Sequence, residues 1–137
     1  MDTIVLIADH EMCRRQELRR FLLRSGFLVT VASDGLETLS EMVALSPDVL
    51  VIAWDLPCCG CGGIISRLNL GLPVNRMPLV KVLGTPSEDR VAKSGVAVSN
   101  WLPTPIDKQS LLDGILSGLP PEIPDIQERM TRARNIV

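Results

Sequence analysis

Aromatic residues are scarce in this sequence, since Phe, Trp and Tyr together make up only 3% of its 137 residues. Apolar residues of all kinds still amount to 46%, which is enough to build a sizeable core. Because aromatic side chains contribute so little, we expect that core to consist of Leu, Val, Ile and Ala. The length is that of one ordinary domain.

Strong net charge and long apolar runs are lacking as well. The formal net charge is -2, which gives no electrostatic reason to expect nucleic acid as a partner. No apolar run reaches the ~18 residues that a membrane-spanning helix needs. The N-terminus carries Asp2, and the apolar run after it is too short for a secretory signal. We therefore expect a cytoplasmic protein that binds neither nucleic acid nor a membrane.

The cysteines are few and crowded. Three of the four, Cys58, Cys59 and Cys61, lie within four residues, too close together for the disulfide framework of a small secreted domain. We expect free thiols. Two sharper interpretations stay open: the Cys58–Cys61 spacing fits a redox-sensitive pair at the start of a helix, and adding His10 and Cys13 gives ligands suited to Zn²⁺.

Short apolar runs alternate with segments of helical periodicity. Apolar runs at 3–8, 27–32, 49–54 and 78–83, and one within 96–102, predict strands. Segments 11–24, 36–45, 63–70, 87–94 and 107–117 predict helices, the last of them capped by Asp107. Five such strand–helix units predict an α/β fold, doubly wound, with a five-stranded parallel sheet and helices on both faces.

The composition changes after Gly118. Three prolines within five residues are followed by a charged stretch. We therefore expect one domain over residues 1–118, and a Pro-rich linker with a charged tail over residues 119–137, where there is room for one short helix.

In open α/β sheets, functional groups collect at the carboxyl ends of the strands. The segments at these ends, VLIADHE, PDVLVIAWDLP and NWLPTPID, together with SDGLETL, resemble the receiver domains of two-component response regulators, especially the chemotaxis regulators. They occur in the right order and at nearly the right spacing over residues 3–117. The resemblance implies a flavodoxin-like sheet with strand order 2-1-3-4-5.

The resemblance also implies a particular chemistry. Receivers carry an acidic pair after strand one and a phosphoacceptor Asp at the end of strand three. Thr or Ser ends strand four, and Lys-Pro follows strand five. The carboxylates hold Mg²⁺ through hard oxygen ligands. The metal and the lysine neutralise the charge on the transferred phosphoryl group.

Most of these positions differ in this chain. Ala53 stands at the acceptor position, and a methyl group cannot attack a phosphoryl donor. His10 replaces the second acid of the pair, and Thr104 replaces the lysine. Leu83 falls at the hydroxyl position, with Thr85 two residues further on. The remnant of the pocket consists of Asp9, His10, Asp55, Leu83, Thr104 and Pro105.

We therefore predict a receiver-like signalling module that acts through protein contacts without aspartyl phosphorylation and is not an enzyme. The partner is a protein of a signalling pathway or a second copy of the chain, and Trp101 is the expected anchor of the partner face. No cofactor is expected, and Mg²⁺ should bind weakly if Asp9 and Asp55 bind it at all. Two alternatives stay open: a phosphoaccepting regulator that uses Asp55, and a thiol or metal sensor that uses the loop from Cys58 to Cys61.

Overall fold

The computed structural model describes residues 3–119, where strands and helices alternate along the chain. All strand pairs are parallel, and the strands lie in the order β2-β1-β3-β4-β5, which confirms the predicted flavodoxin-like sheet. The strands are Ile4–Ala8 (β1), Leu28–Ala32 (β2), Val49–Ala53 (β3), Leu79–Leu83 (β4) and Trp101–Leu102 (β5). The helices are Met12–Arg24 (α1), Gly35–Leu45 (α2), Gly60–Asn69 (α3), Glu88–Ser94 (α4) and Lys108–Gly118 (α5), with a 3-10 turn at Val98–Asn100 (η1).

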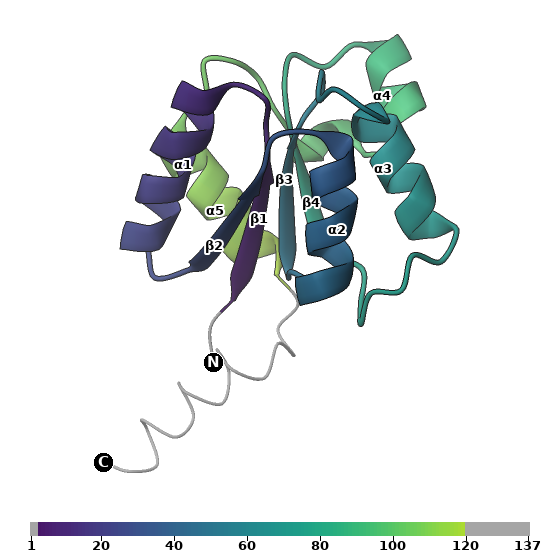
Figure 1. The fold of residues 1–137 in the computed structure, drawn as a ribbon. Helices are drawn as coiled ribbons and strands as arrows, with labels where there is room; N and C mark the ends of the chain where they lie inside the picture. Colours follow the sequence, from purple (N-terminus) through teal and green to yellow (C-terminus); the bar gives the residue numbers. More distant parts are fainter. Residues whose placement is uncertain (1–2, 120–137) are drawn as a thin grey trace.

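Helices cover both faces of the sheet, as Figure 1 shows. Helices α1 and α5 pack on one face, and α2 and α3 pack on the other, with α4 beside α3. Strand β3 lies in the middle of the sheet, and all five of its residues are fully buried. This explains why its sequence is a continuous apolar run, since a strand covered on both faces has no solvent side. None of the helices within residues 3–119 is long and apolar enough to cross a membrane.

Side-chain caps fix where several helices begin. The Asp107 carboxylate accepts a hydrogen bond from the Gln109 N–H at 3.1 Å, which confirms the predicted cap of α5. Asp34 caps α2 in the same way through the Glu37 N–H at 2.9 Å. Helix α4 begins after Ser87, whose hydroxyl accepts from a backbone N–H of the first turn.

Two elements differ from the sequence-based prediction. Helix α3 begins at Gly60 and not at Gly63, because the preceding loop turns tightly through Cys58 and Cys59 with φ angles of 60° and 73°. Strand β5 is only two residues long. The predicted linker and tail lie, after Leu119, outside the described residues.

A lysine lies inside the layer between the sheet and α5. Lys81 of β4 is 7% exposed, and its Nζ donates a hydrogen bond to Asn100 Oδ1 at 2.8 Å. Its amine passes under Gly114 of α5, where an added Cβ would lie only 3.2 Å from Nζ. Burial lowers the pKa of Lys81 from its ordinary value, because the apolar surroundings disfavour the charged form.

Candidate functional site

The carboxyl ends of neighbouring strands meet at one edge of the sheet, as expected for an open parallel sheet. A pocket of about 270 Å³ opens there, and we call it the edge pocket. Its walls include Asp55, Leu83 and Thr104, three of the residues that the sequence singled out. Arg14 from α1 and Arg90 from α4 also line it.

Ala53 lies at the floor of this edge, as the last residue of β3, and pairs in register with Leu83 of β4. Its side chain is fully buried. A buried methyl group offers no nucleophile and no metal ligand. The last residue of the central strand is therefore neither a nucleophile nor a metal ligand through its side chain.

Asp9 follows β1 and is completely buried, so its charge needs partners inside the protein. Its Oδ1 accepts from the Glu11 N–H at 3.0 Å and from Arg14 Nη2 at 2.9 Å. Its Oδ2 accepts from Arg14 Nε at 2.5 Å, which completes a two-pronged guanidinium–carboxylate pair. The hydrogen bond to Asp9 raises the pKa of the Arg14 guanidinium above its ordinary value. Arg15 Nη1 adds a bond to the Asp9 carbonyl oxygen at 2.8 Å.

The residues at this edge do not fit the octahedral oxygen site that Mg²⁺ prefers. Both oxygens of Asp9 already accept hydrogen bonds from nitrogen donors, including Arg14. Ala53 has no ligand atom, and His10 offers an imidazole in place of a carboxylate. Within residues 3–119, no group of three or more His, Cys, Asp or Glu side chains is arranged to hold a metal ion.

Asp55, which lines the edge pocket, forms a second, looser pair with His10. The imidazole Nε2 lies 3.8 Å from Asp55 Oδ2, and Nδ1 lies 3.8 Å from Asp9 Oδ1. Both distances are too long for hydrogen bonds, and the side chains are 42% and 65% exposed. Asp55 is thus a solvent-facing loop acid, two residues beyond the end of β3.

The opposite wall of the pocket comes from the segments after β4 and β5. The Arg90 guanidinium lies over the Trp54 ring at 5.6 Å from its centroid and donates to the Thr85 carbonyl at 3.1 Å. Across the pocket, the Thr104–Pro105 peptide bond is cis. Leu83, at the predicted hydroxyl position, is 2% exposed and packs with the core residues under α1 and α5.

Trp101 is not an exposed anchor, and this part of the sequence-based prediction is wrong. The residue is 5% exposed and packs against Trp54, with the ring centroids 5.5 Å apart. Its indole N–H donates to the Val96 carbonyl at 3.3 Å. The ring turns into the core below α3 and α4 because those helices present the apolar surface it needs.

The cysteine loop is strained but does not form a metal site with its predicted partners. Cys58 and Cys59 are exposed and adopt positive φ angles, a region that L-residues rarely enter. Cys61 is buried, and burial raises the pKa of its thiol to about 12. Cys13 is exposed on α1, and the structure does not gather it with His10 and this loop into a group that could hold a metal ion.

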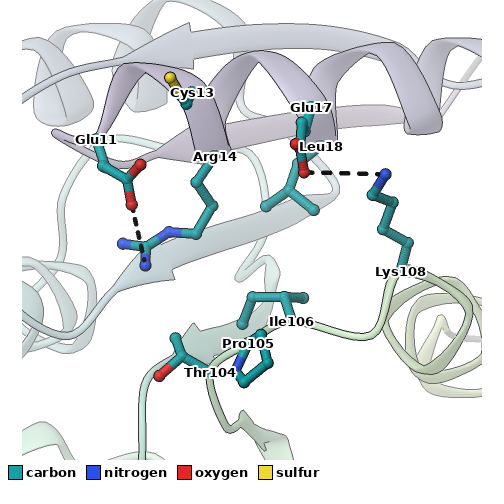
Figure 2. Close-up of a pocket in the computed structure, with 9 residues that line it drawn as sticks. All are labelled: Glu11, Cys13, Arg14, Glu17, Leu18, Thr104, Pro105, Ile106 and Lys108. Carbon is teal, nitrogen blue, oxygen red and sulfur yellow. Dashed lines mark ion pairs between the residues drawn. The ribbon is translucent and has the colours of Figure 1, made fainter.

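A second pocket of about 280 Å³ lies between α1 and the loop that leads into α5. Figure 2 shows Glu11, Arg14 and Glu17 on the α1 side, facing Thr104 and Lys108. Two ion pairs lie among these residues. Arg14 Nη1 is 3.6 Å from Glu11 Oε2, and Lys108 Nζ is 3.9 Å from Glu17 Oε2. Arg14 and Thr104 thus line both pockets.

The sequence-based prediction did not single out Arg14 as a residue of this site. The available signal was spacing: Arg14 lies five residues after Asp9, in the first turn of the helix that follows the strand. A side chain there is long enough to reach back to the strand end.

Comparisons with known proteins point to one group. No protein-family model matches the chain. Response regulator MprA of Mycobacterium tuberculosis (strain H37Rv) is 30% identical over 112 residues, which are 82% of this chain and 48% of that protein. The chain therefore spans about half the length of such relatives.

Solved structures agree on the fold. The chemotaxis response regulator CheY4 of Vibrio cholerae superposes with a TM-score of 0.74 at 22% identity, covering 85% of this chain and 98% of that one. The beryllofluoride-activated NtrC4 receiver domain dimer gives 0.72 at 21% identity, covering 85% and 95%. The chain thus has the fold of response-regulator receiver domains, and its sequence is similar to response regulators over most of its length.

Proposed function

We propose that this chain is a receiver-like signalling module of the two-component type that acts through protein contacts without aspartyl phosphorylation. The observation that carries the proposal is Ala53, a buried methyl group at the end of the central strand. Covalent phosphorylation of a receiver needs a carboxylate at this position, and the neighbouring carboxylate, Asp55, is a solvent-facing loop acid.

The surrounding groups support the same proposal. Phosphoryl transfer depends on cations that neutralise the transferring group. The position of the expected lysine carries Thr104, and the position of the expected hydroxyl carries Leu83, which is buried. Similarity to response regulators such as MprA supports the signalling role. If the module switches, a partner must supply the difference in binding free energy between two states.

Acetyl phosphate and Mg²⁺ test the proposal directly. The intact mass of the full chain should stay unchanged, while a phosphorylatable receiver treated in parallel should gain one phosphoryl group. A gain of one phosphoryl group by this chain, abolished in Asp55→Asn, would contradict the proposal and identify Asp55 as the acceptor. Asp55 is a weak candidate because it is a solvent-facing loop acid, 65% exposed, with the His10 imidazole 3.8 Å away.

The partner surface proposed here is the face formed by η1, β5 and α5, with a second copy of the chain as the partner. Trp101 is buried, so the exposed apolar side chains Val98 and Leu116 take its place as anchors, at 59% and 55% exposure. A similar receiver domain is a dimer, which supports this choice.

Sedimentation velocity should show reversible self-association that Val98→Glu weakens at least tenfold. Leu70→Glu is the matched control, because Leu70 is 84% exposed after α3. A chain that stays monomeric at high concentration would point to a different protein partner.

Oxidant sensing by the cysteine loop is a second candidate function, favoured by the strained backbone at Cys58 and Cys59. Mass spectrometry after mild hydrogen peroxide should then show oxidation at these thiols before Cys13, which is also exposed. Equal oxidation of all exposed thiols would remove this candidate.

A further inference from the structure

The buried carboxylate of Asp9 is paired with a positively charged side chain of the same protein, Arg14. Asp9 is 0% exposed, and an isolated charge cannot remain in such a place without a partner. Arg14 meets it with two parallel N–H···O bonds, from Nε to Oδ2 and from Nη2 to Oδ1. Such a paired geometry is the strongest form of charge-assisted hydrogen bond between side chains.

The same contacts leave no ready place for a divalent ion. Oδ1 accepts from the Glu11 N–H as well as from Arg14, and Oδ2 accepts from Arg14. A metal ion would have to displace the guanidinium from at least one oxygen. It would also place two further positive charges beside Arg14, and the repulsion between like charges is strong in buried surroundings.

We propose that Arg14 is a built-in cation that takes the place of a dissociable metal at Asp9. The Asp9 carboxylate at the end of β1 is then neutralised by Arg14 whether or not divalent ions are present. The contacts at this strand end therefore do not change with the concentration of divalent ions. The inference deepens the proposed function, because a module that has given up phosphoryl transfer no longer needs the metal. It assigns Arg14 a positioning role: the side chain holds the β1 end to the first turn of α1.

The position of Arg14 extends this role to both pockets. Its side chain is 22% exposed and lines the edge pocket as well as the pocket of Figure 2. Nη1 is not engaged with Asp9 and lies 3.6 Å from Glu11 Oε2. The guanidinium therefore connects Asp9, α1 and the Thr104 side of the molecule through one group.

Manganese binding tests the proposal, because Mn²⁺ prefers the same oxygen ligands and can be followed by its electron paramagnetic resonance signal. The full-length wild type should show no saturable binding up to the low millimolar range. Arg14→Met should gain saturable binding at least tenfold stronger, and Asp9→Asn in the same background should abolish it. Arg14→Lys should stay close to the wild type, since a cation remains. Arg19→Met is the matched control, an exposed arginine of the same helix.

The outcomes separate this inference from the proposed function. Saturable binding by the wild type that Arg14→Met does not improve would overturn the built-in cation, as would a folded Arg14→Met that gains no binding. If Arg14→Met fails to fold, the melting temperature of the wild type decides: Mg²⁺ should raise it no more than NaCl of equal ionic strength, and a specific rise would refute the inference. Phosphoryl uptake from acetyl phosphate refutes the proposed function and is read from intact mass, independently of these titrations.

Discussion

Replacing Lys81 by methionine should raise the free energy of unfolding by about 1 kcal/mol at pH 7. The aliphatic stem of Lys81 is already buried, so methionine fills a similar volume in the same apolar surroundings. What the change removes is a buried ammonium whose hydrogen-bond partner is Asn100 Oδ1, at 2.8 Å. Burial lowers the pKa of Lys81, because the apolar surroundings disfavour the charged amine in the folded protein.

The expected gain in stability is the difference between the desolvation cost of the ammonium and the free energy of its hydrogen bond. Desolvation of a buried ammonium costs several kcal/mol, and a hydrogen bond from a charged donor returns roughly 1.5–3 kcal/mol. Lys81 keeps 7% of its surface in contact with solvent, which reduces the cost. The remaining difference of about 1 kcal/mol corresponds to a rise in melting temperature of roughly 3–5 °C for a domain of this size.

The difference in free energy of unfolding between Lys81→Met and the wild type should shrink as pH rises. The folded pKa of Lys81 lies below its ordinary value of 10.5, so the unfolded chain binds more protons between the two pKa values. The stability of the wild type therefore rises relative to Lys81→Met as pH increases through this window. The gap between the two proteins should be largest below the folded pKa and smallest above pH 10.5. The raised pKa of Cys61 also affects stability at high pH, but it is common to both proteins and cancels in the difference.

Urea unfolding followed by tryptophan fluorescence at pH 7 and pH 10.5 measures both effects. Lys93→Met serves as the control, since Lys93 is an exposed residue of α4 in a surface ion pair with Asp89. Its free energy of unfolding should change by less than ~1 kcal/mol. The reasoning is refuted if Lys81→Met is less stable than the wild type at pH 7, or if the gap does not shrink at high pH.

Three further changes and one labelling measurement test the packing described above. Cys59→Gly should raise the free energy of unfolding by about 1 kcal/mol, because it relieves the positive φ of 73°; a loss in a thermal melt would contradict this. Trp101→Ala should lower it by ~3–5 kcal/mol, as for a core aromatic, and a urea midpoint close to that of the wild type would mean that the ring is dispensable. Gly35→Ala should lower it by about 2 kcal/mol or more, because the new Cβ would lie 1.7 Å from the Cys58 carbonyl oxygen; near-native melting would argue against that contact. Cys61, with a thiol pKa raised to about 12, should react with iodoacetamide at pH 8 far more slowly than Cys58, and equal labelling by peptide mass spectrometry would contradict its burial.

The fold could be predicted from the sequence because its signals are local and repeated. Each strand reads as a short apolar run, and the helices carry their own periodicity and caps such as Asp107. The start of α3 could not be predicted in the same way. It depends on positive φ angles at Cys58 and Cys59, and no propensity rule assigns such angles to cysteine.

The site was only partly predictable, because the direction of a side chain depends on tertiary contacts. Ala53 could be placed at the strand end by counting residues along a run. Trp101 could not be oriented, since β5 is two residues long and shows no alternation of buried and exposed positions. Arg14 could point to solvent or back to Asp9, and the structure resolves this by burying the carboxylate.

The shortness of β5 has a consequence for how other chains can approach this edge of the sheet. A long exposed edge strand presents a row of free backbone groups onto which a foreign strand can add. Here the outermost strand is only two residues long, so it offers very few backbone groups to an added strand. This edge therefore resists sheet extension and the aggregation that follows from it, and leaves recognition on this side to side chains of helices and turns.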